Sequence, residues 1–106
     1  MGNIVKEALN QTTTSDYVRV IHQKIPPGAT ELVIDFKEKD TNAVKYKILV
    51  GQKETDVNRE IGATDEVILK NGNDYQVVCG SWVWVDVYVA DNASGSHGIV
   101  DVIVSA

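Results

Sequence analysis

The sequence predicts an all-β fold, an antiparallel β-sandwich of the immunoglobulin-like or jelly-roll type with about seven or eight strands. Three observations lead to this class. Short segments rich in β-branched residues alternate between apolar and polar positions, which is the period of a half-buried strand. Turn-forming residues separate these segments at the spacing typical of a sandwich. No stretch combines helical periodicity with useful length.

The segment from Trp82 to Val89 is the clearest strand. It sets Trp82, Trp84 and Tyr88 on one side and an unbroken series of valines on the other. A second alternating segment, Ile99–Val104, follows a loop of Asp, Asn, Ser and Gly. We expect the two to close as a hairpin whose valines form one apolar face under a second sheet. That pairing would set Val89 opposite Val100, Val87 opposite Val102 and Val85 opposite Val104.

The rest of the chain supplies the remaining strands. Pro26-Pro27-Gly28 is a turn signal, and Asn71-Gly72 between two alternating segments is the strongest short hairpin signal in the chain. The Val57–Ile61 segment is more polar than the others, which favours an edge position. The expected strands before the final hairpin are Tyr17–Ile25, Glu31–Lys37, Ala43–Val50, Val57–Ile61, Glu66–Lys70 and Asp74–Cys79.

The first 16 residues differ from the rest. Ile4, Val5 and Leu9 precede a polar run that is rich in threonine. We expect residues 1–16 to form an N-terminal arm, as a helical turn or an extended segment, and residues 17–106 to form one sandwich domain. A frayed terminus and an arm that docks on another subunit both fit this pattern.

Charge and cysteine content narrow the possible partners. The formal net charge is -5 and the basic residues are scattered, which argues against nucleic acid because phosphate binding needs a basic patch. Cys79 is the only cysteine, so no internal disulfide can form, and we expect a small buried thiol at a strand end. No apolar run is long enough to span a bilayer, so we expect no membrane partner.

The sequence offers little for catalysis, and we expect no enzyme, no cofactor and no metal. His22 and His97 are the only histidines, and neither lies in a recognisable nucleophile or phosphate-binding motif. Asp91, Asn92 and Asp101 offer oxygens for calcium near one loop, but their spacing matches no EF-hand. Turn formation explains Asp91 and Asn92, and we expect His97 to be an exposed loop residue.

The aromatic side of the Trp82–Val89 strand has three open interpretations. It could pack beneath the chain's own arm or a crossing loop, form a subunit interface, or act as a stacking platform for a sugar. Asp86, between the rings, suits either a sugar hydroxyl or a partner's polar group and does not separate these interpretations.

The layout of the chain resembles small virion proteins of tailed bacteriophages, of the capsid decoration or head fibre type. The likeness lies in the opening Val5-Lys6-Glu7-Ala8-Leu9 before a Thr-rich stretch and in the turn Ile25-Pro26-Pro27-Gly28-Ala29-Thr30. It continues in the closing segments, Trp84-Val85-Asp86-Val87-Tyr88-Val89 and Gly98-Ile99-Val100-Asp101-Val102-Ile103-Val104.

This resemblance implies a non-enzymatic structural protein of the virion, assembled in the host cytoplasm. Its implied partners are the major capsid protein and further copies of itself, commonly as a trimer. We expect the contacts to come from Ile4, Val5 and Leu9 of the arm and from Trp82, Trp84 and Tyr88 of the aromatic face. A carbohydrate-binding or receptor-binding module, for which a glycan is the ligand, and a tail or baseplate component remain the alternatives.

Overall fold

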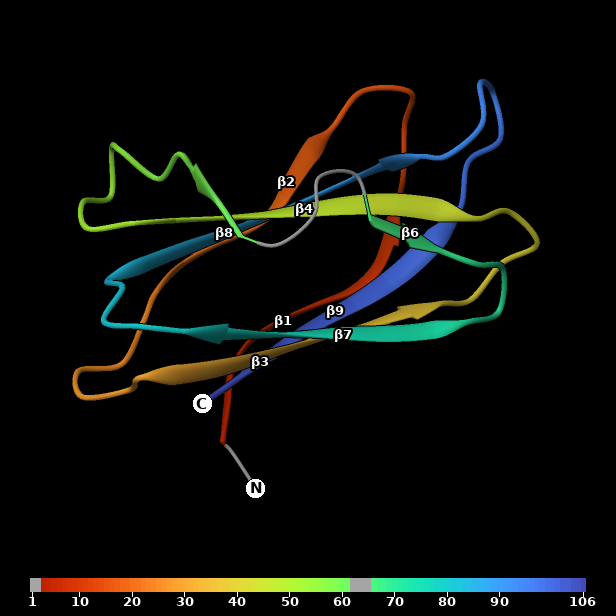
Figure 1. The fold of residues 1–106 in the computed structure, drawn as a ribbon. Helices are drawn as coiled ribbons and strands as arrows, with labels where there is room; N and C mark the ends of the chain where they lie inside the picture. The colour runs from red at the N-terminus through yellow and green to blue at the C-terminus, as the bar shows by residue number, and fades with distance from the viewer. Residues whose placement is uncertain (1–2, 62–65) are drawn as a thin grey trace.

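The computed structural model describes residues 3–61 and 66–106, and it confirms the predicted antiparallel β-sandwich (Figure 1). The described residues contain no helix, and so none that is long and apolar enough to cross a membrane. Within this described part of the chain there are nine strands: β1 (Ile4–Thr12), β2 (Val18–Lys24), β3 (Glu31–Glu38), β4 (Val44–Gly51), β5 (Arg59–Glu60), β6 (Glu66–Ile68), β7 (Asn73–Cys79), β8 (Trp84–Asp91) and β9 (Ile99–Ser105).

The strands form two antiparallel layers that face each other across the core (Figure 1). One sheet has four strands in the order β1-β9-β3-β7. The other has five, in the order β2-β8-β4-β5, with β6 also pairing with β4. The expected weak strand at Val57–Ile61 is β5, and it lies at a sheet edge as predicted.

The expected C-terminal hairpin is wrong. Strand β8 pairs with β2 and β4, whereas β9 pairs with β1 and β3 in the opposite sheet. The valines of both strands are nevertheless fully buried in one core cluster. The loop between β8 and β9 crosses from one layer to the other, and each strand has two neighbours in its own sheet. Alternation predicted which side chains are buried, but it does not distinguish a hairpin from two strands in facing sheets.

The hairpin expected at Asn71-Gly72 is also wrong, because β6 pairs with β4 and β7 pairs with β3. Backbone contacts hold this connection in place. The Gly72 N–H donates to Leu69 O, and the Asn71 N–H donates to the carboxylate of Glu38. Asn71 has the left-handed φ of 52° that its residue type tolerates in a turn.

The N-terminal segment that was expected to be an arm contributes β1 to the four-stranded sheet. It pairs with β9, with register shifts after Ile4 and after Ala8. Val5 and Ala8 pack against the core, which explains why the strand docks on its own chain. Ile4 and Leu9 remain exposed on this edge strand.

The two sheets meet around stacked aromatic rings. Phe36 of β3 and Tyr46 of β4 lie with their ring centroids 3.8 Å apart. The Tyr46 hydroxyl donates to Asp74 Oδ2 and accepts from the Gln76 amide, each at 2.9 Å. Burial raises the pKa of Tyr46 above its ordinary value, because the ionised phenolate would lose its hydration.

Candidate functional site

The outward side of β8 carries a buried carboxylate. Asp86 alternates with core valines and so faces away from the interior, yet its side chain is only 3% exposed. Its register neighbours are His22 on β2 and Leu49 on β4. A carboxylate that is removed from water needs partners, and the side chains around it provide them.

His22 and Arg19 are those partners. The Asp86 Oδ1 atom lies 2.6 Å from His22 Nδ1, and Asp86 Oδ2 lies 3.6 Å from Arg19 Nη1. The carboxylate accepts from the Nδ1–H group, which directs the other ring nitrogen, Nε2, toward Glu54 at 3.6 Å. The Trp84 indole stacks on the imidazole ring of His22, with ring centroids 4.8 Å apart. These contacts hold the His22 ring in one orientation.

The loop between β4 and β5 folds over this face, and the loop and the face together enclose a hollow. Lys53 and Asp56 form a β-bridge within the loop. At its base, a Cβ on Gly51 would collide with the backbone of Asp56 and Val57, so only glycine allows this close approach. The hollow has a volume of about 640 Å³. It is lined by Arg19, His22, Glu54, Thr55, Val57, Asp86 and Tyr88.

The three predicted aromatic contact residues are dispersed. Trp82 lies before β8 and packs against the core, with the Arg59 guanidinium 5.8 Å from its ring centroid. Trp84 lies beside the hollow, and Tyr88 lines it with the Lys47 ammonium 5.2 Å from its ring. They therefore do not form one continuous platform, and the chain's own loop covers part of the face.

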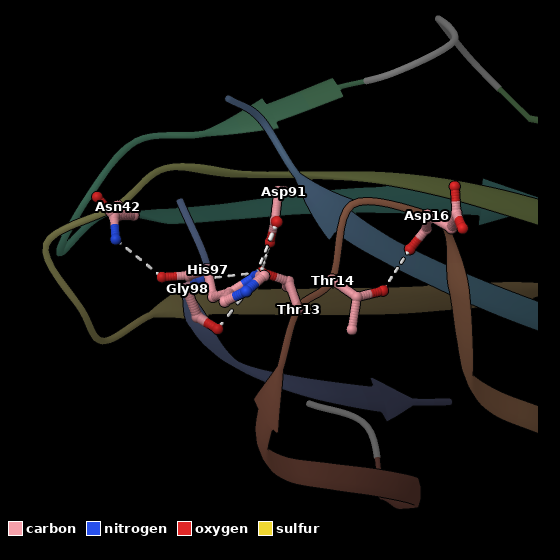
Figure 2. A network of polar contacts seen from close by, with 7 residues as sticks. All are labelled: Thr13, Thr14, Asp16, Asn42, Asp91, His97 and Gly98. Atoms are coloured by element: carbon pink, nitrogen blue, oxygen red, sulfur yellow. Dashed lines mark hydrogen bonds and ion pairs between the residues drawn. The ribbon is translucent and has the colours of Figure 1, made fainter. Parts of the chain in front are cut away.

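A second polar cluster ties the N-terminal segment to the β8–β9 loop (Figure 2). The Thr13 hydroxyl donates to Asp91 Oδ1 at 2.6 Å, and His97 Nδ1 lies 2.8 Å from Asp91 Oδ2. The Gly98 N–H donates to the same hydroxyl at 2.8 Å. Thr13 and Asp91 are buried, while the imidazole of His97 is exposed, as expected for a loop residue.

This cluster has the residue types of a catalytic triad but not its geometry. In a triad the imidazole lies between the hydroxyl and the carboxylate, so that it can remove the proton from the hydroxyl. Here the carboxylate of Asp91 lies in the middle and binds both partners. The Thr13 hydroxyl therefore binds the carboxylate directly, and the His97 imidazole contacts the carboxylate rather than the hydroxyl.

The three oxygen-bearing residues considered for calcium do not converge. Both carboxylate oxygens of Asp91 are used by Thr13 and His97. Asp101 instead accepts from the Asn10 N–H at 2.7 Å and forms an ion pair with Lys39. Within residues 3–61 and 66–106, no group of three or more acidic, histidine or cysteine side chains could hold a metal ion.

Cys79 also differs from expectation, because its side chain is exposed. It occupies the last position of β7, opposite Glu31, on the outward side of the four-stranded sheet. Sequence reasoning likewise missed Arg19, His22 and Glu54 as a group. The one available signal was Asp86, a carboxylate within a run of core valines that required a cationic or hydrogen-bonding neighbour.

Comparisons with known proteins add a distant structural likeness. No family model matches the sequence, and no curated protein matches it at a significant level. The fold is similar to a chain in the structure of infectious bursal disease virus, Gx strain, with a TM-score of 0.45 and 8% sequence identity. The similarity covers 94% of this chain and 31% of that one, so this chain spans less than a third of its neighbour's length.

Proposed function

We propose that this chain is a non-enzymatic structural protein of a virus particle, of the kind that decorates the capsid of a tailed bacteriophage and binds its major capsid protein. The layout resemblance described above suggests this role. The observation that carries it is the exposure of Ile4 and Leu9 on the edge strand β1, at 62% and 46%. Both were expected as contact residues from the sequence.

Strand β1 is suited to a contact with a capsid surface. It lies at the edge of its sheet, where it pairs only with β9 among the described strands. Covering a large aliphatic side chain stabilises a complex by about 1.5–3 kcal/mol at most. Such a contact is weak for one subunit, but a capsid repeats it at many sites.

The structure determines how this proposal is best tested. Deleting residues 1–15 would remove β1 and Thr13, and the sandwich would lose an edge strand and a buried hydrogen-bond network. The substitutions Ile4→Asp and Leu9→Asp change the exposed surface and leave the strand in place. Leu69→Asp is a matched control, because Leu69 is 71% exposed and lies in the β6–β7 connection.

The assay is co-sedimentation with capsids of the encoding virus that lack this protein. We expect the double Ile4→Asp/Leu9→Asp variant to lose binding and to keep its circular dichroism spectrum, while Leu69→Asp binds like the wild type. Equal occupancy of the capsid by all three proteins would refute the role of β1. Immunogold labelling of intact particles distinguishes a head location from a tail or baseplate location.

A carbohydrate-binding module is the second candidate, and the hollow on the β2–β8–β4 face favours it. Trp84 and Tyr88 lie beside a histidine and two carboxylates, which is a combination that suits sugar hydroxyls and ring faces. A titration with oligosaccharides, followed by tryptophan fluorescence, tests this function. A saturable change that Trp84→Ala abolishes supports a glycan site, and an unchanged signal argues against it.

A further inference from the structure

Strand β7 is the one long, regular edge among the sheet edges that the structure describes. The pairing of β1 with β9 and that of β2 with β8 both contain register shifts. The edge strands β5 and β6 have only two and three residues. Strand β7 has seven residues and pairs with β3 without any shift. Bulges and short strands protect edges from pairing with other chains, and β7 has neither protection.

The backbone of β7 directs half of its polar groups toward the open edge. The Gly80 N–H donates to Thr30 O, and the Glu38 N–H donates to Gly72 O. Along an antiparallel ladder, residues that hydrogen-bond to the partner strand alternate with residues that do not. Gly72 and Gly80 bond to β3, and so does every second residue between them. The remaining residues therefore point their N–H and C=O groups away from β3. These positions are Asn73, Tyr75, Val77 and Cys79.

The outward side chains of this edge carry no charge, since they belong to Asn73, Tyr75, Val77 and Cys79. Tyr75 is 63% exposed and Val77 is 43% exposed. Asp74 is the only charged residue of the strand; its Oδ2 atom accepts from the Tyr46 hydroxyl and its Oδ1 atom from the Tyr75 N–H. Pairing at the edge would therefore transfer the Tyr75 N–H from the Asp74 carboxylate to a carbonyl of the second strand. Lysine or proline is the usual edge protection, and β7 contains neither.

We propose that β7 pairs in antiparallel orientation with β7 of a second copy of this chain, across a two-fold axis at Gln76. This register overlaps all seven residues of both strands. It places residues whose N–H and C=O groups point to the open edge opposite the equivalent residues of the second copy, so that these groups can hydrogen-bond to each other. The two four-stranded sheets then become one continuous sheet.

The strand is complementary to itself in this register. Tyr75 lies opposite Val77 of the second copy, and the two-fold axis forms this pair twice. An aromatic residue opposite a β-branched one contributes roughly 0.2–1 kcal/mol more than an alanine pair. Asp74 lies opposite Val78 of the second copy and keeps its contact with the Tyr46 hydroxyl, so the register places no two charged side chains opposite each other. This inference does not depend on the proposed function.

The mass in solution gives the first test. Static light scattering of the wild-type protein should give twice the 11.6 kDa of one chain. Val77→Pro removes an N–H that points away from β3, so the variant should keep its ladder and scatter as a monomer. The matched control Val77→Thr keeps that N–H and should remain a dimer. A wild-type monomer overturns the proposal, and so does the trimer that the sequence resemblance implies.

A cross-link tests the register without relying on the proline variant. Asn73 lies opposite Cys79 of the second copy, at the separation of about 5.5 Å between Cα atoms that a disulfide can bridge. Mild oxidation of Asn73→Cys should therefore give a reducible covalent dimer. The double variant Asn73→Cys/Cys79→Ser should give none, because its introduced thiols lie roughly 20 Å apart across the axis. Failure of Asn73→Cys to cross-link overturns the pairing.

Discussion

Replacing Thr13 with valine tests how much the buried contacts of Thr13 with Asp91 and Gly98, at the two ends of the β8–β9 loop, contribute to stability. Valine has nearly the shape of threonine, so the substitution removes the hydroxyl and leaves the packing almost unchanged. The hydroxyl donates to Asp91 at 2.6 Å and accepts from the Gly98 N–H at 2.8 Å. Both contacts are buried, so water does not replace them.

The expected cost follows from the two lost contacts. A hydrogen bond to a charged group contributes about 1.5–3 kcal/mol, and an unsatisfied buried N–H costs about 1–3 kcal/mol. Thr13→Val should therefore lower the free energy of unfolding by about 2–5 kcal/mol, allowing for partial relaxation of the loop. The melting temperature falls by roughly 4 °C per kcal/mol for a chain of this size. The expected decrease is therefore about 8–20 °C.

Urea denaturation followed by tryptophan fluorescence measures this change. We expect a lower midpoint with an unchanged slope, because a changed slope would mean a different denatured or native state. Thr13→Ser is the matched control: it keeps the hydroxyl, and we expect it to lose only about 1 kcal/mol through the missing methyl group. A Thr13→Val protein within about 0.5 kcal/mol of the wild type would refute the reasoning, since that is the range of neutral surface substitutions.

Two further predictions concern buried polar groups at the sheet ends. The Glu38 carboxylate accepts from the backbone N–H groups of Asp40, Asn71 and Ile99. Glu38→Gln turns an amide NH₂ toward one of these donors, so it should lower the free energy of unfolding, measured by urea denaturation, by about 2 kcal/mol. An unchanged urea midpoint would contradict this. The raised pKa of Tyr46 means that the folded protein keeps the phenol protonated, so its contribution is fully present below the unfolded pKa near 10.0 and is lost as the pH rises above that value. The urea midpoint of the wild type should therefore fall more steeply between pH 9 and 11.5 than that of Tyr46→Phe, and parallel curves would exclude the assignment.

The sequence predicted the strands well because alternation reports burial directly. Val85, Val87 and Val89 were expected to face the interior, and all three are fully buried. The sheet to which each strand belongs was not predictable in the same way. Both a hairpin and a crossing between layers bury the same valines, and the choice depends on long-range pairs such as β1 with β9.

The candidate site was less predictable than the fold, because its members come from distant parts of the chain. His22 and Asp86 are 64 positions apart, and only the pairing of β2 with β8 brings them together. Glu54 reaches them through a loop whose path depends on the close approach at Gly51. The pattern on a single strand can indicate that Asp86 needs a partner, but it does not identify which distant residues supply one.

The position of β9 has a consequence for the order in which the molecule forms. Strands β1 and β3 both use β9 as their neighbour, so the four-stranded sheet cannot close before the last segment of the chain is available. The five-stranded sheet has no such requirement, because β2, β4 and β8 all precede it in the chain. Contacts between opposite ends of a sequence slow folding, since the entropy of a large loop must be lost first. We therefore expect pairing within the β2–β8–β4 layer to precede the closing of the four-stranded sheet.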